Sequence, residues 1–223
     1  MSTPAERRRS LARNPYVWVA ISGIVILTAL RALFPPPVRP PILGRVPEFH
    51  LVDAQGQPYG SADLLDHVWI ANTFFTRCGS ICPKLMSDVG AVSERLLHAR
   101  ATGVRIVSVT VDPDHDTPEI LRAYHAARGI DERWVLLTGS RTDVLALVDQ
   151  GLHLGMGPPS SDAAGLIDIA HSGKVVVVDG AGCIRGYFDP DPTGLDGAYR
   201  TALLVRADAC NPLLEWPAPE DNE

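Results

Sequence analysis

Cys78 and Cys82 are the residues of this 223-residue chain whose types and spacing most clearly indicate chemistry. Three residues separate them, and they lie between an apolar run, residues 67–75, and a helical pattern that begins at Pro83. Unpaired backbone N–H groups and the helix dipole at such a position favour the thiolate, which attacks disulfides and binds metal ions. The spacing alone leaves two interpretations open: a reactive or metal-binding pair, and a structural disulfide in an exported domain.

The elements that must position these thiols alternate between strand and helix after residue 48. Residues 67–75 (HVWIANTFF) and 104–111 are apolar enough to be central strands buried on both faces. Leu85, Val89 and Val92 recur at helical spacing after the second cysteine. Other strands are expected at 48–52, 134–137, 175–178 and 183–188, and other helices after Ser61, Thr117 and Ser140 and over 196–206. This order predicts an α/β, thioredoxin-like fold, a central mixed sheet flanked by helices.

The N-terminal part has a different composition, and it predicts a membrane anchor. Residues 16–30 carry no charge and, with the apolar residues that follow, suffice to cross a bilayer. The arginines at 7, 8, 9 and 13 predict a cytoplasmic N-terminus, with the following domain on the periplasmic, extracytoplasmic side of an inner membrane. A cleaved signal peptide is the alternative, but no small-x-small cleavage site follows, and Arg31 stands where one would fall.

The chain is therefore expected to have five parts. They are a basic tail (1–14), a single-pass transmembrane helix (15–34), a proline-rich linker (35–47), a thioredoxin-like domain (48–212) and an acidic tail (213–223). The whole chain carries a formal charge of −6. Because the N-terminal tail is basic, the rest of the chain forms a body that is more acidic than this value indicates. Such a body lacks the basic surface that nucleic-acid binding requires, so nucleic acid is excluded as a partner.

Three segments in order resemble motifs of the Sco/SenC family. NTFFTRCGSICPKL (72–85) resembles its cysteine motif, VTVDPDHDTPEILRAYHAARG (109–129) its second signature, and AHSGKVVVVDGAG (170–182) its histidine strand. The resemblance implies a membrane-anchored copper chaperone that helps to assemble the Cu-A site of cytochrome c oxidase. Its expected partners are oxidase subunit II and other copper chaperones or thiol reductants.

The resemblance also implies a ligand set, in which Cys78 and Cys82 supply thiolates and His171 an imidazole. Two soft thiolates with an imidazole suit both Cu(I) and Cu(II). The chain departs from the family pattern at Ala170, where an acidic residue often precedes the histidine, and at Gly79, where proline is frequent. Copper affinity is therefore expected to differ from that of relatives.

Three other functions use the same cysteines. A thiol-disulfide oxidoreductase, in which Cys78 attacks and Cys82 resolves, would keep the oxidase's copper-ligand cysteines reduced. This is the one enzymatic activity that we retain as the main alternative to a non-enzymatic metallochaperone. A redoxin-type peroxidase leaves the histidine motif unexplained, and a redox or copper sensor lacks an output domain.

Two more groups of residues call for interpretation. Asp112, His115 and Asp116 lie close together in the sequence and could form a metal cluster, but we favour a structural role in ending a strand and starting a helix. Cys183 and Cys210 lie outside the copper motif, and on the oxidising side of a membrane such a pair is expected to form a structural disulfide. Two unrelated thiols are the alternative.

Overall fold

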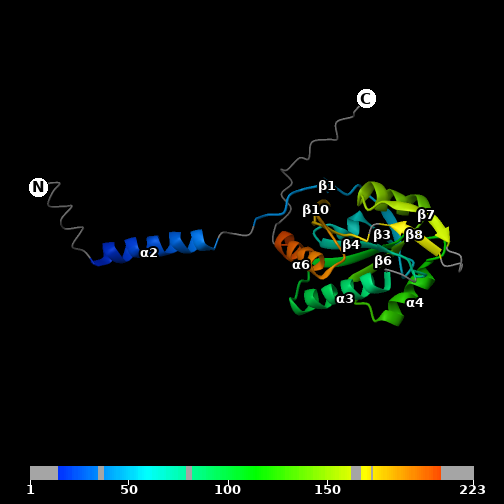
Figure 1. Ribbon diagram of the computed structural model, residues 1–223, viewed down its shortest axis with the longest axis horizontal. Helices are drawn as coiled ribbons and strands as arrows, with labels where there is room; N and C mark the ends of the chain where they lie inside the picture. The colour runs from blue at the N-terminus through cyan, green and yellow to red at the C-terminus, as the bar shows by residue number, and fades with distance from the viewer. Residues whose placement is uncertain (1–14, 35–37, 79–81, 162–166, 172, 207–223) are drawn as a thin grey trace, which may run out of the picture. The chain divides into compact units, whose positions relative to one another are not determined.

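The computed structural model describes residues 15–34, 38–78, 82–161, 167–171 and 173–206. The chain divides into two units, Met1–Val38 and Arg39–Glu223. In the first unit, helix α2 (Pro15–Leu33) has a mean hydropathy of 1.9 and no buried residues (Figure 1). Its length and composition suffice to cross a membrane, although a signal sequence would meet the same criteria.

The second unit is built on an eight-stranded mixed sheet with the strand order β1-β10-β9-β4-β5-β6-β2-β3. Strands β4, β5 and β6 are parallel, whereas β9 runs antiparallel to β4. A separate two-stranded sheet pairs β7 with β8. The strands are β1 (Gly44–Arg45), β2 (His50–Asp53), β3 (Pro58–Gly60), β4 (Val68–Phe74), β5 (Val104–Thr110), β6 (Trp134–Thr138), β7 (Met156–Ser161), β8 (Ile167–His171), β9 (Val175–Val178) and β10 (Cys183–Phe188).

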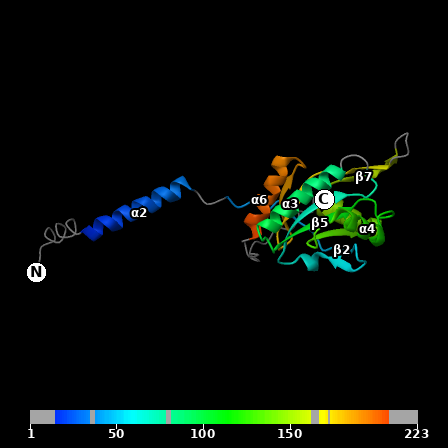
Figure 2. The same cartoon turned by 90° about the horizontal axis from the view of Figure 1, so that it is seen from below.

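Helices cover both faces of this sheet. They are the 3-10 helix η1 (Ser61–Leu64), α3 (Cys82–His98), α4 (Pro118–Arg128), α5 (Arg141–Leu145), the π-helix η2 (Ala146–Gly151) and α6 (Pro192–Arg206). Helices α3 and α6 lie side by side on one face (Figures 1 and 2), where Arg95 donates to Asp196 at 2.7 Å. Helix α4 packs on the same face through Leu121, while α5 and η2 pack on the other through Val144 and Leu147.

Strand β4 lies at the centre of the core, and every one of its residues is buried. Because burial on both faces removes the alternation of polar and apolar residues, the run from 67 to 75 reads as continuously apolar, as predicted. Fully burying a side chain such as Phe74 contributes roughly 1.5 to 3 kcal/mol relative to leaving it exposed. The cysteine-bearing turn therefore starts from a strand that is buried along its whole length.

Local signals place helix α4. The hydroxyl of Thr117 accepts a hydrogen bond from the backbone N–H of Ile120, and Pro118 follows in the first turn. The helix ends at Gly129, whose φ of 60° is left-handed and favours glycine. The predicted cap at Thr117 is confirmed, and so is the cap at Ser140, whose hydroxyl accepts from the N–H of Asp143.

Several sequence expectations need correction. The cap of η1 is Gly60 and not Ser61, because the Asp63 carboxylate accepts from the Gly60 N–H at 2.8 Å. The single helix expected after Ser140 becomes α5 followed by a π-helical turn. The hairpin of β7 and β8 was not predicted. Strand β1 pairs Gly44 and Arg45 with β10, so the sheet begins within the proline-rich segment 35–47.

Candidate metal centre

Cys78 and Cys82 stand four positions apart in the sequence, and both are buried, with exposed fractions of 8% and 1%. Cys82 is the first residue of α3, and its backbone N–H donates to the Cys78 sulfur at 3.4 Å. The first N–H groups of a helix have no partner within the helix, so they are free to stabilise negative charge. This donor therefore favours the thiolate form of Cys78, which is the form that binds metal or attacks a disulfide.

The turn that carries Cys78 is closed by backbone hydrogen bonds. The N–H of Cys78 donates to the carbonyl of Phe75 at 3.3 Å, which folds the chain back directly after β4. The N–H of Val111, just after β5, donates to the carbonyl of Phe74 at 2.9 Å. The carboxyl ends of the parallel strands β4 and β5 are therefore joined immediately before the thiols.

His171 is the last residue of β8, and its backbone pairs with Met156 of β7. The structure describes this residue through its backbone only. The next strand, β9, runs antiparallel to β4 with Val176 opposite Ala71. The end of β4 and the start of β9 therefore lie at the same end of the sheet. The β4–α3 connection begins there, and the β8–β9 connection finishes there.

Tyr124 is a residue near the thiols that sequence reasoning missed. Its ring lies 5.5 Å from that of Phe74, and the Arg128 guanidinium lies 4.5 Å from its centre. Burial raises the pKa of the Tyr124 phenol above its usual value, the charge of Arg128 opposes this, and Cys82, Asp116 and Cys78 add to the increase. The helical spacing from buried Leu121 was the available signal that Tyr124 faces the core.

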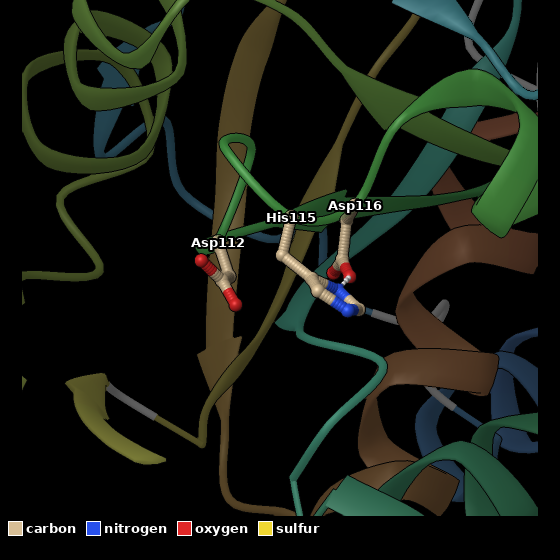
Figure 3. A group of neighbouring side chains, drawn as sticks. All are labelled: Asp112, His115 and Asp116. Atoms are coloured by element: carbon tan, nitrogen blue, oxygen red, sulfur yellow. Dashed lines mark hydrogen bonds and ion pairs between the residues drawn. The ribbon is translucent and has the colours of Figure 1, made fainter. Parts of the chain in front are cut away.

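Asp116 is the centre of a hydrogen-bond network that includes Thr76, two residues before Cys78, and Figure 3 shows its carboxylate beside the ring of His115. Its carboxylate is fully buried and accepts from the backbone N–H of Thr76 at 3.0 Å and from the hydroxyl of Thr110 at 2.5 Å. The Thr76 hydroxyl also donates to it, and the Nδ1 of His115 lies 2.8 Å from its Oδ1. The carboxylate thus links the residues before Cys78 to the end of β5 and the start of α4.

Asp112 forms a neighbouring link. Its buried carboxylate accepts from the Nε and Nη2 of Arg77 at 3.1 and 2.6 Å. Ligand atoms of Asp112, His115 and Asp116 lie within 4.8 Å of one another, as a metal site would require. Since both carboxylates already accept donors from the cysteine turn, these bonds support the structural role predicted for Asp112 and Asp116.

The comparison with protein families decides how to interpret this arrangement. The SCO1/SenC family model matches residues 44–201, a range that includes both cysteines and His171. The chain belongs to the SCO1/SenC family. The family resemblance predicted from the three sequence motifs is confirmed.

Curated relatives agree with this SCO1/SenC assignment. A protein of Stutzerimonas stutzeri named as a candidate copper-binding protein is 29% identical over 155 residues, which cover 70% of this chain and 74% of the relative. A mitochondrial SCO2 homologue of Danio rerio is 30% identical over 145 residues, which cover 64% of this chain and 50% of the relative. The match to the Danio rerio protein is thus confined to half of that protein's length.

Solved Sco structures share the fold. A SCO1/SenC family lipoprotein of Bacillus anthracis aligns with a TM-score of 0.66 at 24% identity, covering 76% of this chain and 99% of that one. Bradyrhizobium japonicum ScoI, solved with copper bound, aligns with a TM-score of 0.61 at 20% identity, covering 72% of this chain and 99% of that one. These likenesses confirm the predicted fold, a thioredoxin-like mixed sheet flanked by helices.

Two cysteines of this SCO1/SenC chain lie outside the cysteine motif. Cys183 opens β10 and is partly exposed, and its N–H donates to the Asp179 carboxylate at 2.9 Å. Cys210 lies outside the described residues. The disulfide between Cys183 and Cys210 therefore stays a prediction.

Proposed function

We propose that this protein is a membrane-anchored copper chaperone. It carries one copper ion on Cys78, Cys82 and His171 and helps to assemble the Cu-A site in subunit II of cytochrome c oxidase. Sco proteins take part in copper binding and oxidase assembly, and this chain belongs to their family. Family membership thus supports copper as the cargo and cytochrome c oxidase as the client. The geometry and chemistry described below support the ligands.

One observation carries the ligand assignment: the antiparallel pairing of β9 with β4. Because of this pairing, the last residue of β4 and the first residue of β9 lie at the same end of two neighbouring strands. Cys78 follows that end of β4, and His171 precedes that end of β9. Neighbouring strands lie about 4.8 Å apart, and this short separation supports the proposal that residues of the two connections share one ion. This is the arrangement that a histidine distant in sequence needs to share a metal with two cysteines.

The chemistry of these three residues suits a cargo ion. Thiolates hold Cu(I) strongly and an imidazole also accommodates Cu(II), so the set does not commit the protein to one oxidation state. Three protein ligands leave the coordination shell open to a ligand from a client protein. Copper then passes by ligand exchange, in which each bond to this chain is replaced by a bond to the acceptor and no electrons move.

The proposed location follows from α2 and from the arginines before it. We place α2 in the inner membrane as a single pass, with the N-terminus in the cytoplasm and the copper-binding domain on the periplasmic side. Reporter fusions test this placement. A periplasm-dependent reporter joined after residue 206 should be active, and the same reporter joined before residue 15 should be inactive.

Metal binding by the full chain, purified in detergent and reduced, tests the ligand set. We expect about one copper per chain, and we expect that Cys78→Ser, Cys82→Ser and His171→Ala each lose it. His98→Ala is the control, because His98 ends α3 and lies about 24 Å along the helix from Cys82. Retention of full copper by His171→Ala would refute the proposed ligand set.

A thiol-disulfide oxidoreductase is the second candidate, and one observation favours it. Cys78, the more exposed thiol, receives the N–H of Cys82, as an attacking thiolate would, while Cys82 is nearly inaccessible. In this reaction Cys78 attacks a client disulfide, Cys82 displaces the client thiol, and the client gains two thiols as the pair becomes a disulfide. A thiol reductant must then restore the pair. His171→Ala should retain this exchange while losing copper, which separates the two functions.

A further inference from the structure

His115 differs from the carboxylates of its cluster because part of its ring is accessible. Its side chain is 34% exposed, whereas that of Asp116 is fully buried. Figure 3 shows the ring pointing toward Asp116, with one nitrogen at the carboxylate and the other directed away from it. The two ring nitrogens therefore have different surroundings.

The network fixes the identity of each nitrogen. Asp116 accepts from the N–H of Thr76 and the hydroxyl of Thr110, so it acts as a carboxylate and takes a proton donor from His115 as well. In the neutral ring Nδ1 then carries the hydrogen and Nε2 keeps its lone pair. Among the described residues, Nε2 makes no hydrogen bond. A carboxylate holding the opposite nitrogen is the arrangement that orients metal-binding histidines in proteins.

The ring lies beside the cysteine turn. Its Nδ1 is 3.4 Å from the hydroxyl of Thr76, which stands two residues before Cys78. Thr76 lies within the turn that the hydrogen bond from the Cys78 N–H to the Phe75 carbonyl closes. Burial is the main reason that the pKa of the nearby Tyr124 phenol is raised, and the charges of Cys82, Asp116 and Cys78 add to it.

We propose that His115 is a capture ligand for copper, which binds the incoming ion through Nε2 and passes it to Cys78 and Cys82. The inference rests on the proposed function and adds a residue to it. The thiols are 8% and 1% exposed and the His115 side chain is 34% exposed, so the imidazole is the most accessible of these three side chains to an ion in solution. Transfer is ligand exchange at constant oxidation state: the nitrogen bond breaks as sulfur bonds form, and the thiols release their protons to water.

The carboxylates of the cluster have a different role. Asp112 is engaged by Arg77, and Asp116 by its four donors, so neither is needed to hold the ion. Asp116 acts as a positioning residue that fixes the ring of His115. This division of labour makes the capture ligand separable from the network by mutation.

His115→Asn tests the proposal. The asparagine amide can still donate to Asp116 from a position close to that of Nδ1, but it has no counterpart of Nε2. The reduced full chain in detergent is mixed anaerobically with Cu(I) bound to a coloured chelator, and the loss of colour gives the rate of loading. We expect loading to slow about tenfold, which is the lower end of the range for residues that support a metal site. The final copper content should not change.

Two controls complete the experiment. His98→Ala should load at the wild-type rate, and thermal unfolding of copper-free His115→Asn shows whether the fold is intact. Loading of His115→Asn at the wild-type rate overturns the inference, and so does loss of its bound copper at equilibrium. If the wild-type chain binds no copper, the proposed function itself is refuted. If His115→Asn binds a normal amount of copper at the wild-type rate, only the role of His115 is refuted.

Discussion

Replacing Asp116 should destabilise the whole domain, because its carboxylate joins three segments of the chain. Asp116→Ala removes the acceptor of four donors, two from Thr76 and one each from Thr110 and His115. A buried donor left without a partner costs about 1 to 3 kcal/mol, and the partly exposed imidazole and the hydroxyls can recover part of this from water or other acceptors. We therefore expect the free energy of unfolding to fall by about 3 to 4 kcal/mol.

Urea unfolding of the reduced, copper-free chain, followed through its tryptophan fluorescence, measures this loss. Trp69 and Trp134 are buried in the sheet and report on the domain. Asp114→Ala is the matched control, because Asp114 is 67% exposed and its ion pair with Arg141 is worth less than about 1 kcal/mol. An unfolding midpoint of Asp116→Ala equal to that of the wild type, or an equal loss in Asp114→Ala, would refute the reasoning.

Three further predictions concern other parts of the domain. Peptide mapping by mass spectrometry of chain isolated under oxidising conditions should show Cys183 joined to Cys210, and recovery of both as alkylated thiols would contradict the pairing. Tyr124→Phe should remove an ionisation above pH 10 from the ultraviolet titration of tyrosinate, since burial raises the pKa of this phenol. The Arg133 side chain donates to the Asp131 carboxylate and lowers the pKa of that carboxyl. The pair therefore stabilises the folded chain at pH values above the unfolded-state pKa of about 3.9. This stabilisation is lost as pH falls through the lower pKa of the folded state. The stability difference between the wild type and Arg133→Met should accordingly shrink in urea titrations as pH drops below about 4, and a constant difference would count against it.

Local patterns predicted those parts of the fold whose signals lie within a few residues. The continuous apolar run of β4, the cap at Thr117 and the turn between β9 and β10 are of this kind. The hairpin of β7 and β8 has no such signal, because β7 contains Pro158 and Pro159, and prolines in a sequence argue against a strand.

In the candidate site, too, the residues with local sequence signals could be predicted and those that depend on distant contacts could not. Cys78 and Cys82 could be found from their spacing and from the helix that follows them. The network around Asp116 could not, since it joins Thr76 to a residue forty positions later through contacts that only the parallel pairing of β4 and β5 creates. His115 was accordingly interpreted with the structural carboxylates, although its accessible nitrogen distinguishes it from them.

The separation of the β7–β8 hairpin from the main sheet has a consequence for delivery. The two thiols belong to the eight-stranded body, whereas the backbone of His171 belongs to a ladder that shares no strand with it. For the proposed ligands, a movement of the hairpin would take His171 away from the ion without breaking any hydrogen bond of the eight-stranded sheet. Unloading would then demand far less work than unfolding, which is what a reusable carrier requires.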